Sequence, residues 1–434
     1  MTIPTRAIPG SAPAHDGRTP LVRWRAARFA ATALVAALAL AACGASNTPA
    51  ATPGAPTGEP IVVMATAPVD AQLVSLPQYI DVVQAYAKAV NAAGGIGGRP
   101  LQITTCDNQA SPTQTAACAR QAVQDKAVAA VGWAIESPAF LQVLSDAKTP
   151  WVAGVAQTPD AFTNANSFPV TVGSIQQGMG QVAAAVKEGC RSAALVANEA
   201  LVARAKPQQD ALAKQGIATT LVTYPSNISD VGPVVAQLKG ADCLIIGATS
   251  DTFVAQLGAA LPQAGVTFKR IISNANLTTE LASQNPQTWE GTVITGLVTN
   301  VAGPQWKEFR DAVEVYSTVD KRKHSPTTAQ PMWVAMSVLT NTVRGMVAQG
   351  QNVTGASVQQ ALTATATADS DETGPPLNLT TQSRVPGFPR LFAPYMGFSS
   401  VRNGAVQPAY DGTYHDILPF ILGEKSTDPF FAAG

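Results

Sequence analysis

The chain has 434 residues, with 28 basic and 28 acidic side chains, and only 13% of its residues are charged. This balance leaves no basic field of the kind that attracts nucleic acid, so no nucleic-acid partner is expected. The length predicts two domains of ordinary size.

The first 42 residues predict an export signal. A positive stretch from Arg18 to Arg28 precedes the uncharged run Phe29–Ala42, which is too short to span a bilayer as a helix. The run ends in Leu-Ala-Ala-Cys at Cys43, which resembles a bacterial lipobox, where the Cys thiol carries a diacylglycerol after cleavage. We therefore expect lipidation of Cys43 and a lipid-anchored location at the extracytoplasmic face of the cell membrane. An ordinary signal peptide with a chance Cys is the alternative.

The segment after Cys43 predicts a tether. Residues 44–60 consist of Pro, Ala, Thr, Ser, Gly and similar residues with a single acid, Glu59. Such a composition cannot bury enough apolar surface to fold, so residues 43–60 are expected to be flexible.

From Ile61 onward, short apolar runs alternate with segments of helical periodicity. Strands are predicted at residues 61–66, 101–106, 127–132 and 150–155, and in a second series at 192–198, 217–225, 242–248, 268–273 and 292–299. The intervening helices are expected to begin at serine caps, namely Ser75 (with Gln78 completing a capping box), Ser111, Ser137 and Ser174. Near-continuous apolar strands that alternate with helices predict two doubly wound parallel sheets.

After Val301 the pattern changes. Helices are predicted over 306–316, 327–348 and 355–362, followed by a long polar loop. Two strands around Asn403-Gly404 predict a hairpin.

Four cysteines follow Cys43, and an even number in an exported chain indicates disulfides with three possible connectivities. Their spacings match no zinc pattern, so no metal is expected. Cys118 lies on the helix that follows the strand ending at Cys106. Cys190 precedes the first strand of the second series and Cys243 begins its third; these strands are neighbours in the order 2-1-3. We predict the pairs Cys106–Cys118 and Cys190–Cys243; four free buried thiols are the alternative.

Three stretches of the first half are distinctive: the helix end AVNAAGGIGGRPL, the strand end CDNQASP before a helix, and DKAVAAVG before a loop. Together they resemble the first lobe of ABC-transporter substrate-binding proteins of the branched-chain amino-acid (Leu/Ile/Val-binding) type. The resemblance covers most of the chain from Ile61 to about Pro408 and is weakest beyond Val301. The glycines follow a helix and do not form GxGxxG, which excludes a dinucleotide fingerprint.

This resemblance implies a type 1 periplasmic-binding fold: two Rossmann-like α/β lobes, three hinge crossings, and a ligand held between the lobes. Lobe 1 would comprise residues 61–173 and 301–388, and lobe 2 residues 174–300 and 389–434. It also implies a small-molecule ligand, an ABC permease as partner, a monomer, and no cofactor.

Ligands of open α/β sheets lie beyond the carboxyl ends of the strands, where helix N-termini offer free N–H groups. The candidate contacts are Trp133, Glu136, Ser137, Gln157 and Thr158 in lobe 1, and Asn198, Thr249, Ser250, Asn274 and Asn276 in lobe 2. For Trp133 the alternative is a core position, and for Glu136 a solvated one.

Five of these residues also have a purely structural interpretation. Ser137, Thr158 and Ser250 are expected to cap helices whether or not they contact a ligand. Asn198 and Asn274 could instead satisfy the backbone of their own loops.

The chain departs from the amino-acid-binding pattern in three places. Ala156, in GVAQTPD, stands where the family has Thr; ANEALVARA lacks the expected aromatic; and SNANL lacks the acid that would meet a ligand ammonium. Because a buried ammonium needs a paired carboxylate, a neutral or amide-like solute is expected instead of an ordinary branched-chain amino acid.

The leading function is delivery of a small polar ligand (an amino acid, amide or related solute) to a permease. A ligand-sensing receptor subunit of the same fold is the alternative. An exported enzyme is a remote third, because the sequence contains no Gly-x-Ser-x-Gly or His-Glu-x-x-His motif, so no catalytic residue is assigned.

Overall fold

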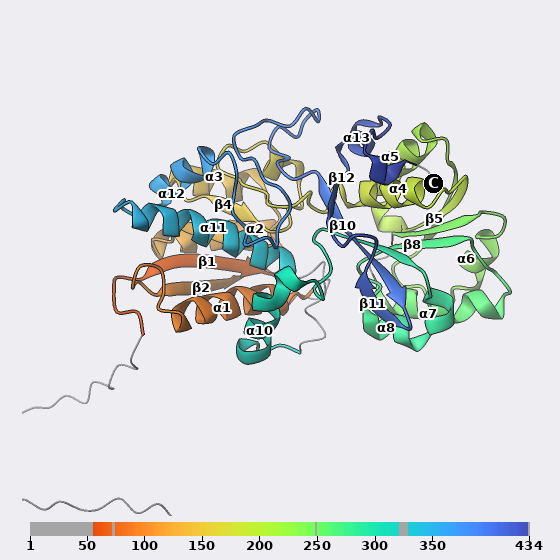
Figure 1. The fold of residues 1–434 in the computed structure, drawn as a ribbon, viewed down its shortest axis with the longest axis horizontal. Helices are drawn as coiled ribbons and strands as arrows, with labels where there is room; N and C mark the ends of the chain where they lie inside the picture. The colour runs from red at the N-terminus through yellow and green to blue at the C-terminus, as the bar shows by residue number, and fades with distance from the viewer. Residues whose placement is uncertain (1–54, 72–73, 248–249, 321–328, 433–434) are drawn as a thin grey trace, which may run out of the picture. The chain divides into compact units, whose positions relative to one another are not determined.

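The computed structural model describes residues 55–71, 74–247, 250–320 and 329–432. These residues form two sheets, each flanked by helices (Figure 1). The export signal, Cys43 and Thr249 lie outside the described residues. Among the helices that are described, none combines the length and the apolar character that a membrane crossing requires.

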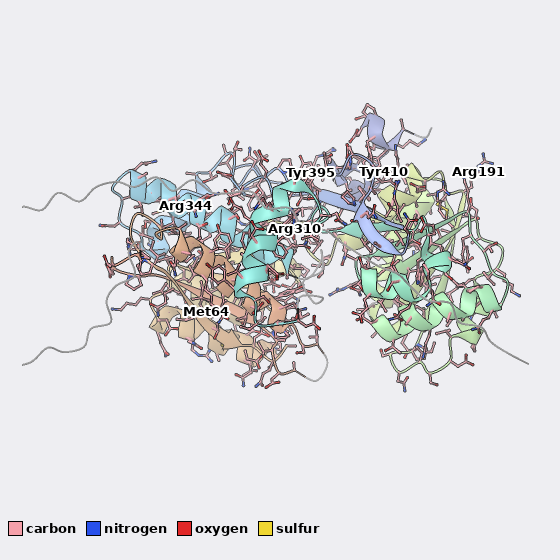
Figure 2. The ribbon with its side chains drawn as sticks, turned by 60° about the horizontal axis from the view of Figure 1, so that its bottom comes forward. Met64, Arg191, Arg310, Arg344, Tyr395 and Tyr410 are labelled. Carbon is pink, nitrogen blue, oxygen red and sulfur yellow. A yellow bond between two sulfur atoms is a disulfide. The ribbon has the colours of Figure 1, made fainter. Side chains whose placement is uncertain are left out.

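The first sheet is parallel and has the strand order β2-β1-β3-β4. Its strands are β1 (Ile61–Ala67), β2 (Leu101–Asp107), β3 (Ala129–Gly132) and β4 (Trp151–Ala153). All four strands that the sequence predicts for this lobe are confirmed. Strands β1, β3 and β4 are apolar because both of their faces are covered, whereas the edge strand β2 is partly exposed. Met64, labelled in Figure 2, lies in the middle of β1 and has no exposed surface.

The second sheet has the order β11-β10-β9-β8-β7-β5-β6, with β12 paired to β10. Its parallel strands are β5 (Ser192–Asn198), β6 (Ala218–Tyr224), β7 (Cys243–Gly247), β8 (Arg270–Asn274) and β9 (Val293–Gly296). The antiparallel part consists of β10 (Tyr395–Arg402), β11 (Ala405–Pro408) and β12 (Tyr414–Asp416). The hairpin prediction is confirmed: Asn403 and Gly404 join β10 to β11 with φ values of 53° and 73°, as a two-residue turn requires.

Helices connect the strands of both sheets. Around the first sheet they are α1 (Pro77–Ala92), α2 (Pro112–Gln124), α3 (Pro138–Asp146), η1 (Pro159–Phe162), η3 (Pro304–Trp306), α10 (Lys307–Tyr316), α11 (Gln330–Ala348) and α12 (Gly355–Thr363). Those of the second are α4 (Gln177–Lys187), η2 (Glu199–Leu201), α5 (Val202–Lys214), α6 (Gly232–Gln237), α7 (Asp251–Gln263), α8 (Thr279–Gln284), α9 (Pro286–Trp289), α13 (Leu418–Leu422) and η5 (Pro429–Phe431). The predicted helices after Val301 are confirmed within a few residues.

The chain passes between the two sheets more than once. It leaves the first sheet after β4 and builds β5 to β9 of the second. Helices α10 and α11 then return to pack on α1, and α11 also contacts β3 and β4. The chain finally enters β10 of the second sheet. Each lobe is therefore made of separated pieces of sequence, as the family resemblance implies.

Two expected caps are wrong. Helix α1 begins at Pro77 with Leu76 at its N-cap, and the hydroxyl of Ser75 donates instead to the Val69 carbonyl. Helix α4 begins at Gln177, and Ser174 bonds to the loop after β4. The hydroxyl of Ser75 is taken by a backbone carbonyl earlier in its own loop, and that of Ser174 by the side chain of Gln157 in another loop.

Residues 55–60 are attached to the first lobe, although the sequence predicts a free tether over 43–60. The N–H of Gly58 donates to the Gly98 carbonyl at 2.9 Å, and Arg99 Nε donates to the Glu59 carbonyl at 2.8 Å. The composition of this segment gives no sign of these contacts, because they use backbone groups.

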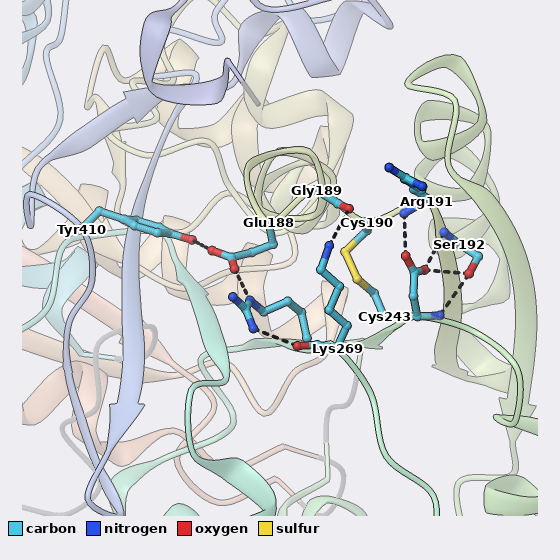
Figure 3. The surroundings of a disulfide bond; sticks show 10 residues. Glu188, Gly189, Cys190, Arg191, Ser192, Cys243, Lys269 and Tyr410 are labelled. Atoms are coloured by element: carbon cyan, nitrogen blue, oxygen red, sulfur yellow. Dashed lines mark hydrogen bonds and ion pairs between the residues drawn. A yellow bond between two sulfur atoms is a disulfide. The ribbon is translucent and has the colours of Figure 1, made fainter. Parts of the chain in front are cut away.

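Both predicted disulfides are present. Cys106–Cys118 joins β2 to α2, with its Cα atoms 5.6 Å apart. Cys190–Cys243 joins the residues at the starts of β5 and β7, with Cα atoms 5.9 Å apart (Figure 3). The second pair follows from the 2-1-3 order, since β5 pairs with both β6 and β7.

Candidate functional site

The first part of the candidate site lies where β3 and β4 end. Gly132 ends β3 with φ +127°. The backbone N–H of the next residue, Trp133, donates to the Thr66 carbonyl at 2.9 Å. Trp133 is half-buried and packs against the core of the lobe. The loop from Trp133 to Ser137 then leads into α3.

Glu136 is completely buried, so the interpretation that it is solvated is wrong. Its Oε2 accepts the N–H of Gln157 at 3.0 Å and the N–H of Thr158 at 3.2 Å. Burial raises the pKa of Glu136 to about 8, although N–H groups including those of Gln157 and Thr158, together with the indole of Trp151, act to lower it. The carboxyl group is therefore mostly protonated at neutral pH.

The serine and threonine of this part have different roles. The Ser137 hydroxyl accepts the N–H of Phe140 at 3.2 Å, which confirms it as the cap of α3. Thr158 stands at the N-cap position of η1 but makes no side-chain cap; its hydroxyl donates to the Glu136 carbonyl at 2.8 Å. The cap role expected for Thr158 is therefore wrong, because the Glu136 carbonyl takes its hydroxyl.

Gln157 joins the same loop to the segment that leads toward α4. Its Oε1 accepts the hydroxyl of Ser174 at 2.9 Å, and its Nε2 donates to the Val155 carbonyl at 3.4 Å. The structure thus brings Glu136, Gln157 and Thr158 into one hydrogen-bonded cluster.

Asn108 is a buried residue beside the candidate site that the sequence reasoning did not single out. It is fully buried at the end of β2, and its Nδ2 donates to Thr66 Oγ1 at 3.0 Å and to the Trp133 carbonyl at 2.7 Å. Asn108 therefore ties together the ends of β1, β2 and β3. A signal was present, since the stretch CDNQASP places a polar residue directly after an apolar strand.

The second part of the candidate site lies at the carboxyl ends of β5, β7 and β8. Asn198 is buried and its Oδ1 accepts the N–H of Ala200 and the hydroxyl of Ser226. Asn274 Oδ1 accepts the N–H of Asn276 at 3.2 Å. Each asparagine side chain thus accepts a backbone N–H of the loop that it begins, as the structural alternative given for these two residues predicts.

Ser250 and two acids mark the helix starts of this second part. The Ser250 hydroxyl accepts the N–H of Phe253 at 3.3 Å, which confirms it as the cap of α7. Asp251 and Glu280 stand in the first turns of α7 and α8. Burial and the charge of Glu280 raise the pKa of Asp251. Negative side chains are stabilised at helix N-termini, which accounts for their position without a ligand.

The two parts of the candidate site present hydrogen-bonding groups. They offer helix N-termini, backbone N–H groups, amides and hydroxyls at the carboxyl edges of two parallel sheets. Among the described residues no group of three or more His, Cys, Asp or Glu side chains could hold a metal ion. These features define the class of protein: a two-lobed α/β binding protein of the type 1 periplasmic-binding fold.

Comparison with known families agrees. Residues 65–384 match the periplasmic binding protein family, and the chain therefore belongs to that family. The family membership expected from the sequence motifs is confirmed. No curated sequence matches the chain.

Solved structures share the fold at low sequence identity. A leucine-binding protein from Thermotoga maritima has 17% identity and a TM-score of 0.60, covering 82% of this chain and 99% of its own. A fatty acid ABC transporter substrate-binding protein from Thermomonospora curvata has 14% identity and a TM-score of 0.62, with coverages of 84% and 95%. A solute-binding protein from R. palustris in complex with 4-hydroxybenzoate has 15% identity and a TM-score of 0.63, with coverages of 82% and 97%.

Proposed function

We propose that the protein is an extracytoplasmic solute-binding protein that delivers a small polar ligand to an ABC permease. The observation that carries the proposal is the family fold together with the polar cluster of Glu136, Gln157 and Thr158 at the carboxyl edge of the first sheet. The structural neighbours named above include ABC-transporter binding proteins, which supports a transport role over the exported-enzyme alternative.

The ligand is a neutral, amide-like solute in this proposal. The neighbours bind leucine, fatty acid and 4-hydroxybenzoate by their descriptions, so the shared fold leaves the ligand open. The side chains of this chain are more informative. Glu136 is buried against backbone N–H groups and is mostly protonated, so it offers no free carboxylate to a ligand ammonium. Gln157, Ser137 and Asn276 can exchange hydrogen bonds with an uncharged ligand.

The experiment is ligand identification followed by a defined panel. Small molecules that co-purify with the protein from its native host are identified by mass spectrometry after denaturation. Thermal shift and calorimetry then compare L-leucine with primary carboxamides such as benzamide. The proposal expects binding of neutral amides and no saturable binding of L-leucine. Tight L-leucine binding would contradict the ligand class, and turnover of a bound compound would contradict the binding role itself.

Lipid anchoring at Cys43 is part of the same proposal. It is supported by the Leu-Ala-Ala-Cys ending of the apolar run, and two acyl chains on a diacylglycerol would hold the protein at a membrane. We expect Cys43→Ala to move from the detergent phase to the aqueous phase when membranes of the native host are partitioned. Cys106→Ala, which removes a cysteine of the folded domain, is the control that should stay in the detergent phase. Retention of Cys43→Ala with the membrane would refute the anchor.

A further inference from the structure

Glu136 connects two loops that the sequence separates by about twenty residues. Besides the two N–H donors on its Oε2, the Thr158 hydroxyl lies 2.8 Å from its carbonyl oxygen and 3.4 Å from Oε2. All of these contacts come from the loop after β4. One buried carboxyl group thus binds the backbone of that loop at two successive residues.

The same loop is held on its other side by the segment after η1. Thr171 Oγ1 donates to the Gly154 carbonyl at 2.8 Å, and the N–H of Ser174 donates to the Ala156 carbonyl at 2.9 Å. These bonds leave the N–H groups of Gln157 and Thr158 to Glu136. Without Glu136, two backbone donors would lose their partner in a partly buried loop.

We propose that Glu136 is a positioning residue, which holds the loop Val155–Thr158 in the single conformation that forms the first-lobe part of the ligand site. The inference rests on the proposed function only in assigning that loop to the site. Glu136 itself has no exposed surface and therefore does not contact a ligand in this conformation.

The surroundings of Glu136 favour a neutral acid. Its Oε1 is buried without a hydrogen-bond partner, and the same is true of Trp151 Nε1, which nevertheless lies close enough to lower the pKa of the carboxyl. The described helices that pack on β3, β4 or α3 carry four charged side chains, namely Arg120 on α2, Asp146 on α3, Asp160 on η1 and Arg344 on α11. None of them contributes to the pKa shift of Glu136. An uncompensated buried carboxylate is costly, whereas a protonated one can still accept both N–H bonds on Oε2.

Protonation gives the proposal a measurable signature. Opening of the loop returns Glu136 to water, so its pKa drops from about 8 to its ordinary value of 4.5. By linkage, the equilibrium constant for loop opening then rises by up to about tenfold for each unit of increasing pH between these two values. Above them it no longer depends on pH. Protection of the Gln157 and Thr158 amides should fall in the same way as pH rises.

The test is amide hydrogen exchange of the whole protein from pH 5.5 to 9, corrected for the intrinsic pH dependence of exchange and read at Gln157 and Thr158. Wild type should lose up to about tenfold in protection per pH unit below pH 8. Glu136→Gln, which keeps one oxygen acceptor and cannot ionise, should retain the protection and lose the slope. Asp160→Asn, which removes a nearby carboxylate, is the matched control and should keep the wild-type slope. Glu136→Ala should expose both amides at every pH.

Three results would overturn the proposal. The first is an equal slope in wild type and Glu136→Gln, which would place the titrating group elsewhere. The second is protection without a slope in both. The third is loss of protection in Glu136→Gln at all pH values, since a neutral acceptor should suffice. None of these readouts uses a ligand, so failure of the ligand panel leaves this test unaffected, and the two failures can be told apart.

Discussion

Gly132 shows how one backbone position constrains the candidate site. It ends β3 at φ +127°, and a Cβ atom added there would lie 2.0 Å from the Thr66 carbonyl oxygen. That oxygen belongs to the backbone of β1 and also accepts the N–H of Trp133, so it cannot move without disturbing the loop that carries Glu136.

We therefore expect Gly132→Ala to lower the free energy of unfolding by about 3 kcal/mol or more, because it combines an unfavourable φ with a backbone clash. Urea denaturation measures the change. Gly345→Ala is the control: Gly345 lies in α11 with no atom within 4 Å of an added Cβ, so it should stabilise by about 0.5–1 kcal/mol. A small effect of Gly132→Ala would mean that β3 shifts freely against β1.

Asp242 connects the amino ends of β5 and β7 through hydrogen bonds. Desolvation would raise the pKa of Asp242, but the Ser192 hydroxyl and the N–H groups of Arg191 and Ser192 outweigh it and lower the pKa. A lowered pKa in the folded state stabilises the fold above the ordinary pKa of about 3.8, and this contribution is lost as pH falls through the folded value.

Asp242→Asn should consequently be less stable than wild type at pH 7, and the difference should shrink toward pH 3. Urea midpoints at pH 7, 5 and 3 measure it, with Asp210→Asn on the exposed surface of α5 as control. The same difference in urea midpoint at all three pH values would show that the negative charge of Asp242 does not contribute to stability.

At the residue scale, the sequence predicts local contacts well and distant ones poorly. Ser137 and Ser250 cap helices that begin at the very next residue, so the pattern alone suffices. The burial of Glu136 depends on a loop about twenty residues away, and the Ser174 hydroxyl is taken by Gln157 of another loop. The Ser75 hydroxyl is taken by the Val69 carbonyl, which the folding of their shared loop brings close. No local pattern contains that information.

At the scale of elements, the strand order was predictable and explains both disulfides. Parallel strands joined by helices follow the 2-1-3 order, which places Cys190 beside Cys243 at the amino edge of the second sheet. The Cys106–Cys118 pair needs only a helix that packs back on its own strand.

The two disulfides should differ in their contribution to stability. They close loops with sequence separations of 12 and 53 residues. Chain entropy then gives about 3 kcal/mol for Cys106–Cys118 and about 4 kcal/mol for Cys190–Cys243. We expect the double variant Cys190→Ala/Cys243→Ala to lose more unfolding free energy than Cys106→Ala/Cys118→Ala. The reverse order in urea denaturation would contradict the entropic account.

At the scale of the whole molecule, the alternation of apolar strands and helices was enough to predict two lobes, each built around parallel strands. The repeated passage of the chain between the sheets came from the family resemblance and not from periodicity. Helix α11 contacts β3 and β4, and α10 packs on α1, although both helices lie far from these elements in sequence. The ligand remains the least predictable part, since proteins of this fold bind chemically different solutes.

If the ligand lies between the lobes, as the family resemblance implies, binding should draw them together about the connecting segments. Small-angle X-ray scattering should then give a smaller radius of gyration at saturation with the compound identified by mass spectrometry. A permease could distinguish the loaded from the empty protein by this change. An unchanged radius at saturation would indicate a rigid site.

The contacts of Gly58 and Glu59 with the first lobe would determine the orientation of the protein at a membrane. Gly58 and Glu59 bond to Gly98 and Arg99, next to the amino ends of β1 and β2, whereas Glu136 and Gln157 follow the opposite ends of β3 and β4. If Cys43 is the anchor, the chain up to Ala55 spans at most about 45 Å when fully extended. The first lobe would then be attached to the membrane through the edge opposite its ligand loops, so that those loops face away from the attachment point. Docking on a permease in the same membrane would require the domain to reorient while it stays attached through the short segment that ends at Ala55.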